Sequence, residues 1–232
     1  VTGTASGAPV RDGTPVWIQP LGLSSRIRGL QVHGDAVEQA TSGHRVAANL
    51  AGIERDDLAR GMVVVADPDL TPASVLDVHL SMLSQAPRIA SGQHVRLLIG
   101  TAEVLAVADP IGQDALEPGR EQLVQLRTES PIVALPGDRF IIRRESPLQT
   151  LGGGTVLDPW SRRAKRKHHV TFAHDLNALM AGDSSRLLHR AGPAGLSATQ
   201  AKIRGASGGI ALSDRRVHPE HIDALGQYIT AA

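Results

Sequence analysis

The chain has 232 residues, of which 41% are hydrophobic and 20% are charged, and its formal net charge is +1. This is a globular composition and excludes an intrinsically disordered chain, while the absence of cysteine excludes disulfide bonds, thiolate metal sites and cysteine nucleophiles. Because no apolar run approaches the roughly 18 residues of a membrane span and no signal-peptide layout opens the chain, we expect a soluble, cytoplasmic protein without membrane contact.

Residues 1–69 are predicted to form a first antiparallel β-barrel. Turn signals recur at the spacing of roughly 8–12 residues that is typical of barrels and sandwiches. Glu54 to Arg60 is the one helix-like interval, because acidic residues precede a basic end and Gly61 follows. The first residue is Val1 and not Met, so we expect a piece of a longer protein.

Residues 70–160 are predicted to form a second antiparallel β-barrel. Apolar and polar residues alternate from Ser74 to Leu83, and His94 to Val107 fits a long strand pair or a bent strand. Near its end, Arg139 to Arg143 is predicted to be a strand with Phe140 and Ile142 on one face. The glycine triplet at 152–154 predicts a place where the backbone closely approaches another group.

Residues 161–232 change character and are predicted to be a basic linker followed by a partial, helical domain. The block at 162–169, RRAKRKHH, is typical of a solvated linker, and otherwise of an electrostatic contact with nucleic acid. Helices are predicted over Val170–Met180 and Ser184–His189. Ser197 is predicted to cap a short helix that ends at the glycines near 205, and a last helix is expected from Pro219 through Leu225 and Ile229.

Four stretches together resemble one family of translation GTPases, the selenocysteine-specific elongation factors. They are PGDRFIIRRESPLQTLGGGTVLD at 136–158, VTGTASGAPVRDGTPVWIQP at the start, RIRGLQVHGDAVEQATSGHRVAANLAGIERDDLARGMVVV and HVRLLIGTAEVLAVADP. The resemblance covers about residues 1–160. It implies a mainly β chain with two tandem antiparallel barrels of the translation-factor type, followed by an incomplete winged-helix region, and it implies that a GTPase domain precedes them.

The resemblance implies an aminoacyl pocket that includes His33 and Arg45. A selenol is more acidic than a thiol or a hydroxyl, so the selenocysteinyl side chain is largely anionic at neutral pH, and a guanidinium with an imidazole favours it. Charge-assisted hydrogen bonds of this kind contribute roughly 1.5–3 kcal/mol. The alternative from the residues alone is that His33 is a turn residue and that Arg45 pairs with Asp35 or Glu38 on the surface.

The resemblance also implies a contact with the backbone of the transfer RNA. Arg144, Glu145 and Ser146 match a loop that faces the T stem in related factors, and Arg143 and Arg144 supply charge that contacts phosphate. Arginines there position RNA through its phosphates without reading sequence. The alternative is a solvated strand end.

Neither the phosphate loop GxxxxGK[ST] nor the guanine-reading NKxD is present, so we predict no catalytic residue, no enzyme activity and no cofactor on this chain. GTP and Mg²⁺ belong to the full-length family. The implied partners are selenocysteinyl-tRNA, the ribosome and the GTPase domain. Binding of a messenger RNA hairpin is not expected, because residues 198–213 are too few for the middle helices of a winged helix.

Other interpretations stay open at this point. His168, His169, His174 and Asp175 are of metal-ligating types, but their spacing matches no motif and we predict no metal site. An enzyme would need a nucleophile and a base that converge, such as Ser146 near a histidine. The remaining alternatives are a tandem barrel of another translation-type GTPase, such as an initiation-factor or sulfate-activating relative, and a module that binds protein only.

Overall fold

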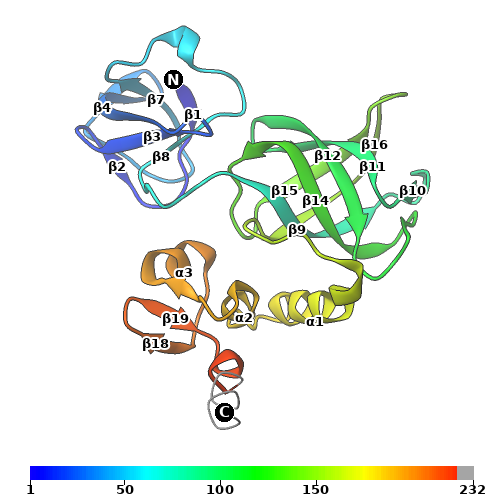
Figure 1. Cartoon of the computed structure of the whole chain (residues 1–232). Coiled ribbons are helices and arrows are strands. Elements are labelled where there is room, and N and C mark those ends of the chain that lie inside the picture. Colours follow the sequence, from blue (N-terminus) through cyan, green and yellow to red (C-terminus); the bar gives the residue numbers. More distant parts are fainter. Residues whose placement is uncertain (224–232) are drawn as a thin grey trace. The chain divides into compact units, whose positions relative to one another are not determined.

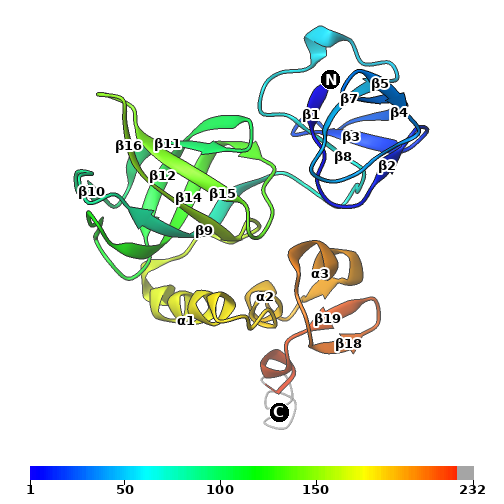
Figure 2. The same cartoon turned by 180° about the vertical axis from the view of Figure 1, so that it is seen from behind.

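A computed structural model describes residues 1–223, which divide into two compact units (Figures 1 and 2). The first unit is Val1–Pro72 and the second begins at Ala73. The finer division into 1–69, 70–160 and 161–232 stays a prediction. Among the described residues, no helix is both long and apolar enough to cross a membrane.

The first unit is built from short strands around a small apolar core. Its strands are β1 (Thr2–Thr4), β2 (Val10–Arg11), β3 (Pro15–Gln19), β4 (Leu23–Val32), β5 (Asp35–Val37), β6 (Gln39–Ala40), β7 (Arg45–Leu50) and β8 (Val63–Val65). The main sheet has the order β1-β7-β4-β3-β8, with β5 on β4, and β2 pairs β6. Within residues 1–72 this sheet does not close by hydrogen bonds. The core consists of Val16, Ile18, Ile27, Leu30, Ala40, Val46 and Leu50.

The helix expected over Glu54 to Arg60 is wrong in extent, because only the 3₁₀ turn η1 (Arg55–Asp57) forms. A capping box between Glu54 and Asp57 starts the turn. None of its residues is buried. Most helical stability in proteins comes from packing an apolar face, so without such a face the charged pattern supports only one turn.

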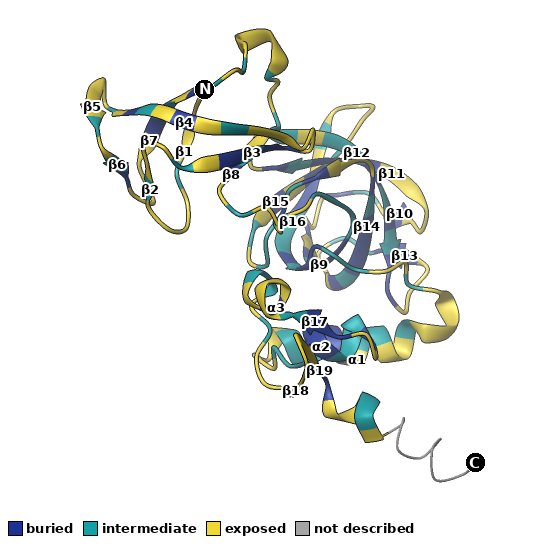
Figure 3. Cartoon of the chain, turned by 60° about the vertical axis from the view of Figure 1, so that its left-hand side comes forward, coloured by how far each residue is buried: buried dark blue, intermediate teal, exposed yellow. Residues whose placement is uncertain are grey.

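The second unit contains a closed barrel of six antiparallel strands, and this confirms the prediction for this part of the chain. Its strands are β9 (Ala73–Met82), β11 (Gln93–Ile99), β12 (Ala102–Pro110), β14 (Glu121–Ile132), β15 (Arg139–Arg144) and β16 (Gln149–Asp158), in the order β11-β12-β14-β9-β16-β15. A separate ribbon pairs β10 (Ile89–Ala90) with β13 (Ala115–Leu116). Alternate residues of β9, Leu76, Val78 and Leu80, lie in the core, as the sequence pattern predicts. Figure 3 shows buried residues along the strands of this barrel.

The glycine triplet lies within β16, between β9 and β15. A β-carbon at Gly152 would overlap the carbonyl oxygen of Ser81, and one at Gly154 would overlap that of His79. The close approach predicted from the sequence is therefore an approach between neighbouring strands of the barrel. On the facing strand, Phe140 and Ile142 are both buried, as predicted.

After the barrel, the chain forms helices and a small sheet. The elements are η2 (Arg166–His168), α1 (His169–Met180), α2 (Arg186–Ala191), β17 (Leu196–Ser197), α3 (Ala198–Arg204), β18 (Ile210–Leu212) and β19 (Arg215–Val217), with sheet order β17-β19-β18. The sequence periodicity predicted only the helices of this region, because strands of two or three residues are too short to show alternation. Residues 219–223 are helical, and Leu225 and Ile229 lie outside the described residues.

The start and end of α3 follow from its sequence as predicted. The hydroxyl of Ser197 accepts a hydrogen bond from the Gln200 backbone NH at 3.1 Å, and the Gln200 side chain accepts one from the Ser197 backbone NH. This is a reciprocal capping box. Gly205 ends the helix in the left-handed conformation, with φ of 70°, that glycine adopts without a steric penalty.

Candidate functional site

The two residues predicted for an aminoacyl pocket lie at the same end of the β4–β7 strand pair. Val32 pairs with Val46, and the next residues outward are His33 and Arg45. His33 is the first central residue of the two-residue turn to β5, with φ of 56°, so it is indeed a turn residue. Both side chains belong to exposed residues. The register therefore brings an imidazole and a guanidinium to one end of the sheet.

Arg45 forms no ion pair within the part of the chain that the structure describes. Among residues 1–223 its guanidinium has no carboxylate within ion-pair distance, so neither Asp35 nor Glu38 neutralises it. Its backbone is fixed by strand pairing, because Arg45 lies opposite Thr4 in β1. The surface-pairing interpretation of Arg45 is thus not what the structure shows, and its positive charge remains exposed to a ligand.

The four residues predicted to contact RNA backbone lie at the end of β15 and in the turn that follows. Arg144 is exposed, whereas Arg143 is half-buried and its Nε atom is buried without a hydrogen bond. Glu145 accepts a hydrogen bond from Arg96 at 2.8 Å. Ser146 is exposed. Of the two predicted arginines, Arg144 is therefore the one whose charge is most accessible.

Arg96 is a neighbour of this loop that the sequence did not single out. It lies directly opposite Arg143 in the β11–β15 pair, and besides Glu145 it contacts Glu103 at 3.1 Å. Two like charges placed opposite each other repel, so the two glutamates offset that repulsion. The role of Glu145 in the structure is to balance Arg96.

The most buried ionic cluster among the described residues lies on the outer face of the barrel, and the sequence did not reveal it. Asp77 in β9 pairs in register with Gln125 in β14 on one side and with Asp158 at the end of β16 on the other. Arg190 in α2 bonds Asp77 through Nη2 and Asp158 through Nε at 3.2 Å. Arg204 in α3 donates from Nη2 to both carboxylate oxygens of Asp158, each at 2.8 Å.

The side chains of this cluster are almost inaccessible to solvent. The side chains of Asp77 and Asp158 are 0% and 1% exposed, and those of Arg190 and Arg204 are 6% and 10% exposed. Burial, and to a smaller extent the charge of Asp158, raises the pKa of Asp77 to about 6 despite the attraction of Arg190. The four charges hold α2 and α3 against β9 and β16.

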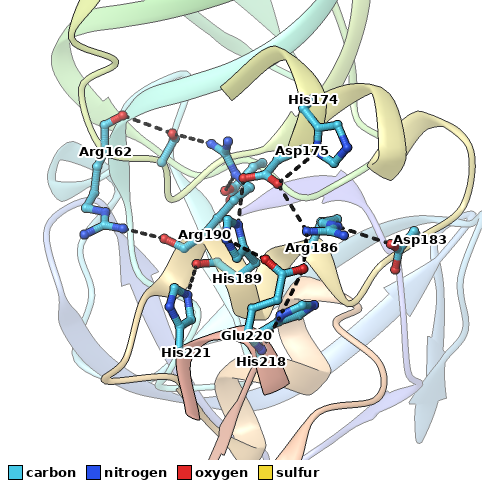
Figure 4. A network of polar contacts seen from close by, with 12 residues as sticks. Arg162, His174, Asp175, Asp183, Arg186, His189, Arg190, His218, Glu220 and His221 are labelled. Carbon is cyan, nitrogen blue, oxygen red and sulfur yellow. Dashed lines mark hydrogen bonds and ion pairs between the residues drawn. The ribbon is translucent and has the colours of Figure 1, made fainter. Parts of the chain in front are cut away.

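A second polar network joins α1, α2 and residues 218–221 (Figure 4). His189 contacts Asp175 at 3.0 Å through Nδ1, and its ring stacks on that of His221 at a centroid distance of 4.9 Å. Arg186 bonds Glu220 at 3.1 Å. Burial lowers the pKa of His218, so its neutral form is favoured. The network packs the end of the described chain on α2.

The histidines considered as metal ligands are not brought together. His169 accepts a hydrogen bond from the Gly112 backbone NH at 3.0 Å, and His174 lies 3.8 Å from Asp175. Within residues 1–223, no group of three or more His, Asp or Glu side chains is placed to hold a metal ion.

Comparison with known proteins identifies the family. The β-barrel domain model of the selenocysteine-specific elongation factor matches residues 76–163. The selenocysteine-specific elongation factor of Desulfomicrobium baculatum is 38% identical over 208 residues, which are 88% of this chain and 32% of that protein. This chain belongs to the family of selenocysteine-specific elongation factors.

Other relatives agree with this membership. The selenocysteine-specific elongation factor of Escherichia coli K12 is 28% identical over 72% of this chain and 26% of that protein. Elongation factor Tu 2 of Streptomyces avermitilis is 28% identical over 67% of this chain and 41% of that protein. The chain thus spans less than half the length of each of these relatives.

A solved structure shares the fold. The crystal structure of a bacterial selenocysteine-specific elongation factor superposes with a TM-score of 0.81 at 23% identity, over 99% of this chain and 38% of that one. At this identity the likeness shows the fold alone. It nevertheless extends across the small region of helices and short strands after the barrel, because it covers 99% of the chain.

Proposed function

We propose that this chain is the part of a selenocysteine-specific elongation factor that binds selenocysteinyl-tRNA for delivery to the ribosome. The observation that supports it most directly is the exposed, unpaired guanidinium of Arg45 beside His33 at one end of the β4–β7 pair. In this proposal, GTP dependence comes from a GTPase domain. That domain lies in the part of the relatives that this chain does not span. On this chain we propose no catalytic residue and no cofactor.

The chemistry of the cargo explains how such a site selects. A selenolate carries a negative charge at neutral pH and a seryl hydroxyl does not, so a guanidinium and an imidazole bind the selenocysteinyl group more tightly. A charge-assisted hydrogen bond is worth roughly 1.5–3 kcal/mol, which is about 10- to 150-fold in affinity. Selection of this size depends on a free cation, and Arg45 is one.

The phosphate backbone of the transfer RNA is proposed to contact the loop after β15. Arg144 supplies the accessible charge there, and Arg143, Glu145 and Ser146 shape the loop. Such contacts add affinity that falls with salt and is the same for both aminoacyl forms. They therefore position the transfer RNA, while the end of the β4–β7 pair discriminates its cargo.

The test is the affinity of the chain for selenocysteinyl-tRNA and for seryl-tRNA with the same nucleotide sequence. Arg45→Ala is expected to reduce the preference for selenocysteinyl-tRNA by about 10-fold or more, because it removes the charge-assisted bond. Arg28→Ala is the matched control: Arg28 is also exposed on this sheet, but it lies four residues before Val32 and roughly 13 Å from that strand end.

An unchanged preference in Arg45→Ala contradicts the aminoacyl site. His33→Asn tests the second residue, because asparagine tolerates the positive φ of this turn position and leaves the backbone intact. Equal binding of elongator, initiator and selenocysteine transfer RNAs indicates a barrel pair of a different translation GTPase. Absence of binding to any transfer RNA indicates a module that binds protein only.

A further inference from the structure

A pocket of about 810 Å³ lies in the second unit, between the chain that leaves the barrel and the elements α2, β17 and α3. Arginine and lysine outnumber aspartate in its lining. The cations are Arg162, Arg163, Lys165, Arg190, Arg204 and Arg215, and the carboxylates are Asp158 and Asp175. Half of the cations come from the basic block at 162–169, which the proposed function does not use.

The two carboxylates are already neutralised. Asp158 is paired with Arg190 and Arg204, and Asp175 lies 3.8 Å from the guanidinium of Arg186. The four other cations have no carboxylate partner among the described residues. Arg162 donates to the carbonyl oxygen of Arg190 at 2.7 Å (Figure 4), and Arg215 donates to those of Ala194 and Gly195. The lining therefore carries positive charge that no carboxylate among residues 1–223 balances.

The basic block is held in place and is not a free linker. Gln125 is buried in the barrel wall, and its amide donates to the carbonyl oxygen of Arg162 at 3.0 Å while its oxygen accepts from the Ala164 backbone NH at 2.8 Å. The backbone on both sides of Arg163 is thus fixed to β14. Arg163 and Lys165 are nevertheless exposed, so their charges are presented from a fixed backbone.

We propose that this pocket binds the phosphate backbone of RNA, as a site separate from the aminoacyl site. The unbalanced cations come from two walls, the block at 162–165 and Arg215 on β19, which suits the repeated charges of a polyanion better than one small anion. Trp160 also lines the pocket, with the guanidinium of Arg204 5.9 Å from the centre of its ring. An aromatic side chain in a cationic groove is the usual combination for single-stranded RNA.

The test compares two lysines that differ in their place but not in their chemistry. Lys165 and Lys167 are both exposed, and only Lys165 lines the pocket. Fluorescence anisotropy with a labelled oligo(U) and with deacylated tRNA, over a range of salt concentrations, gives the affinity and its salt slope. Each lost phosphate contact on single-stranded RNA reduces the slope by about 0.7.

Lys165→Ala is therefore expected to lower the slope by about 0.7, and Arg163→Ala/Lys165→Ala by about 1.4, while Lys167→Ala leaves it unchanged. Both substitutions keep the backbone bonds to Gln125, so the fold is retained. A lower slope with both probes supports a site that binds the backbone of any RNA. A lower slope with tRNA alone supports a site that binds tRNA.

Equal effects of Lys165→Ala and Lys167→Ala overturn the proposal, because the block then acts as diffuse surface charge. An unchanged salt slope in the double variant also overturns the proposal. So does a result in which Lys165→Ala weakens the binding of inorganic pyrophosphate but not the binding of RNA. Arg45→Ala is included to separate the two sites. It is expected to leave the oligo(U) slope unchanged, whether or not the aminoacyl proposal holds.

Discussion

Arginines in the two units meet opposite surroundings. Arg45 in the first unit begins a strand, is exposed and has no carboxylate partner among the described residues. Arg190 and Arg204 in the second unit are almost fully buried and share Asp158. The first arrangement leaves a charge available to a ligand, and the second uses two charges to hold helices on a barrel. The role of an arginine in this chain thus depends on whether other elements cover its side chain.

The difference arises on the outer face of the second unit's barrel. Asp77 points away from the apolar core of β9, and in an uncovered barrel it would be solvated. Here α2 and α3 cover that face, so Asp77 and Asp158 are buried and need cations. The outward charge of a strand becomes structural only because later parts of the chain pack on it.

The largest effect is expected from Asp158→Ala. This change leaves Arg204 without a carboxylate and Arg190 with Asp77 only, so we expect the free energy of unfolding to fall by about 3–5 kcal/mol, as for other broken buried ion pairs. Urea unfolding followed by Trp160 fluorescence in a Trp17→Phe background reports the second unit alone, because the chain has 2 tryptophans.

Asp114→Ala is the control for that loss. It removes the ion pair with Arg166, whose side chains are 76% and 78% exposed. An exposed pair contributes within about 1 kcal/mol. If the two substitutions have similar costs, the buried cluster is not what holds α2 and α3, and the contrast between the two sets of arginines is lost.

A smaller effect is expected from pH through Asp77. Its pKa is about 6 in the folded protein, above the ordinary value of 3.8, so the folded state holds its proton more tightly than the unfolded state. Stability from this group is complete below about pH 4 and is lost as the pH rises to about 6, by at most about 3 kcal/mol.

The measurement is the difference in unfolding free energy between the wild type and Asp77→Asn from pH 4 to 7. Other carboxylates titrate in both proteins and cancel in the difference. The wild type is expected to become less stable relative to the variant as the pH rises. A constant difference across this range would contradict the raised pKa and would mean that Arg190 fully compensates the burial of Asp77.

The smallest effect is expected from Arg45→Ala on stability. The side chain has no ion pair to lose within residues 1–223. Exposed substitutions of this kind usually change the unfolding free energy by less than about 0.5 kcal/mol. Unfolding followed by Trp17 fluorescence in a Trp160→Phe background measures it in the first unit. A loss above about 1 kcal/mol would show that Arg45 supports the fold, and its effect on cargo preference would then have a structural cause.

The barrel could be predicted from the sequence because its signals are local. Alternation in β9 and in β15 places Leu76 and Phe140 in the core, and the glycine triplet marks the crowded strand between them. The cap of α3 depends on two residues three positions apart. The helix expected at Glu54 forms only one turn, because its signal was charge alone and it has no apolar face to pack.

The ionic cluster could not be predicted, because its partners are far apart in sequence. Asp77 and Arg190 are separated by 113 residues, and no motif links them. The basic block had a clear composition but two interpretations. What separates these interpretations is the pair of bonds from Gln125, an ordinary strand residue that nothing in the sequence distinguishes.

Gln125 lies in the interior of β14, which pairs with both β9 and β12. Its two bonds attach the departing chain to the middle of a barrel wall and not to a loose strand end. The barrel therefore fixes the direction in which the backbone leaves it at residue 164. A load applied to the C-terminal elements is shared by three adjacent strands before it can peel away any one of them.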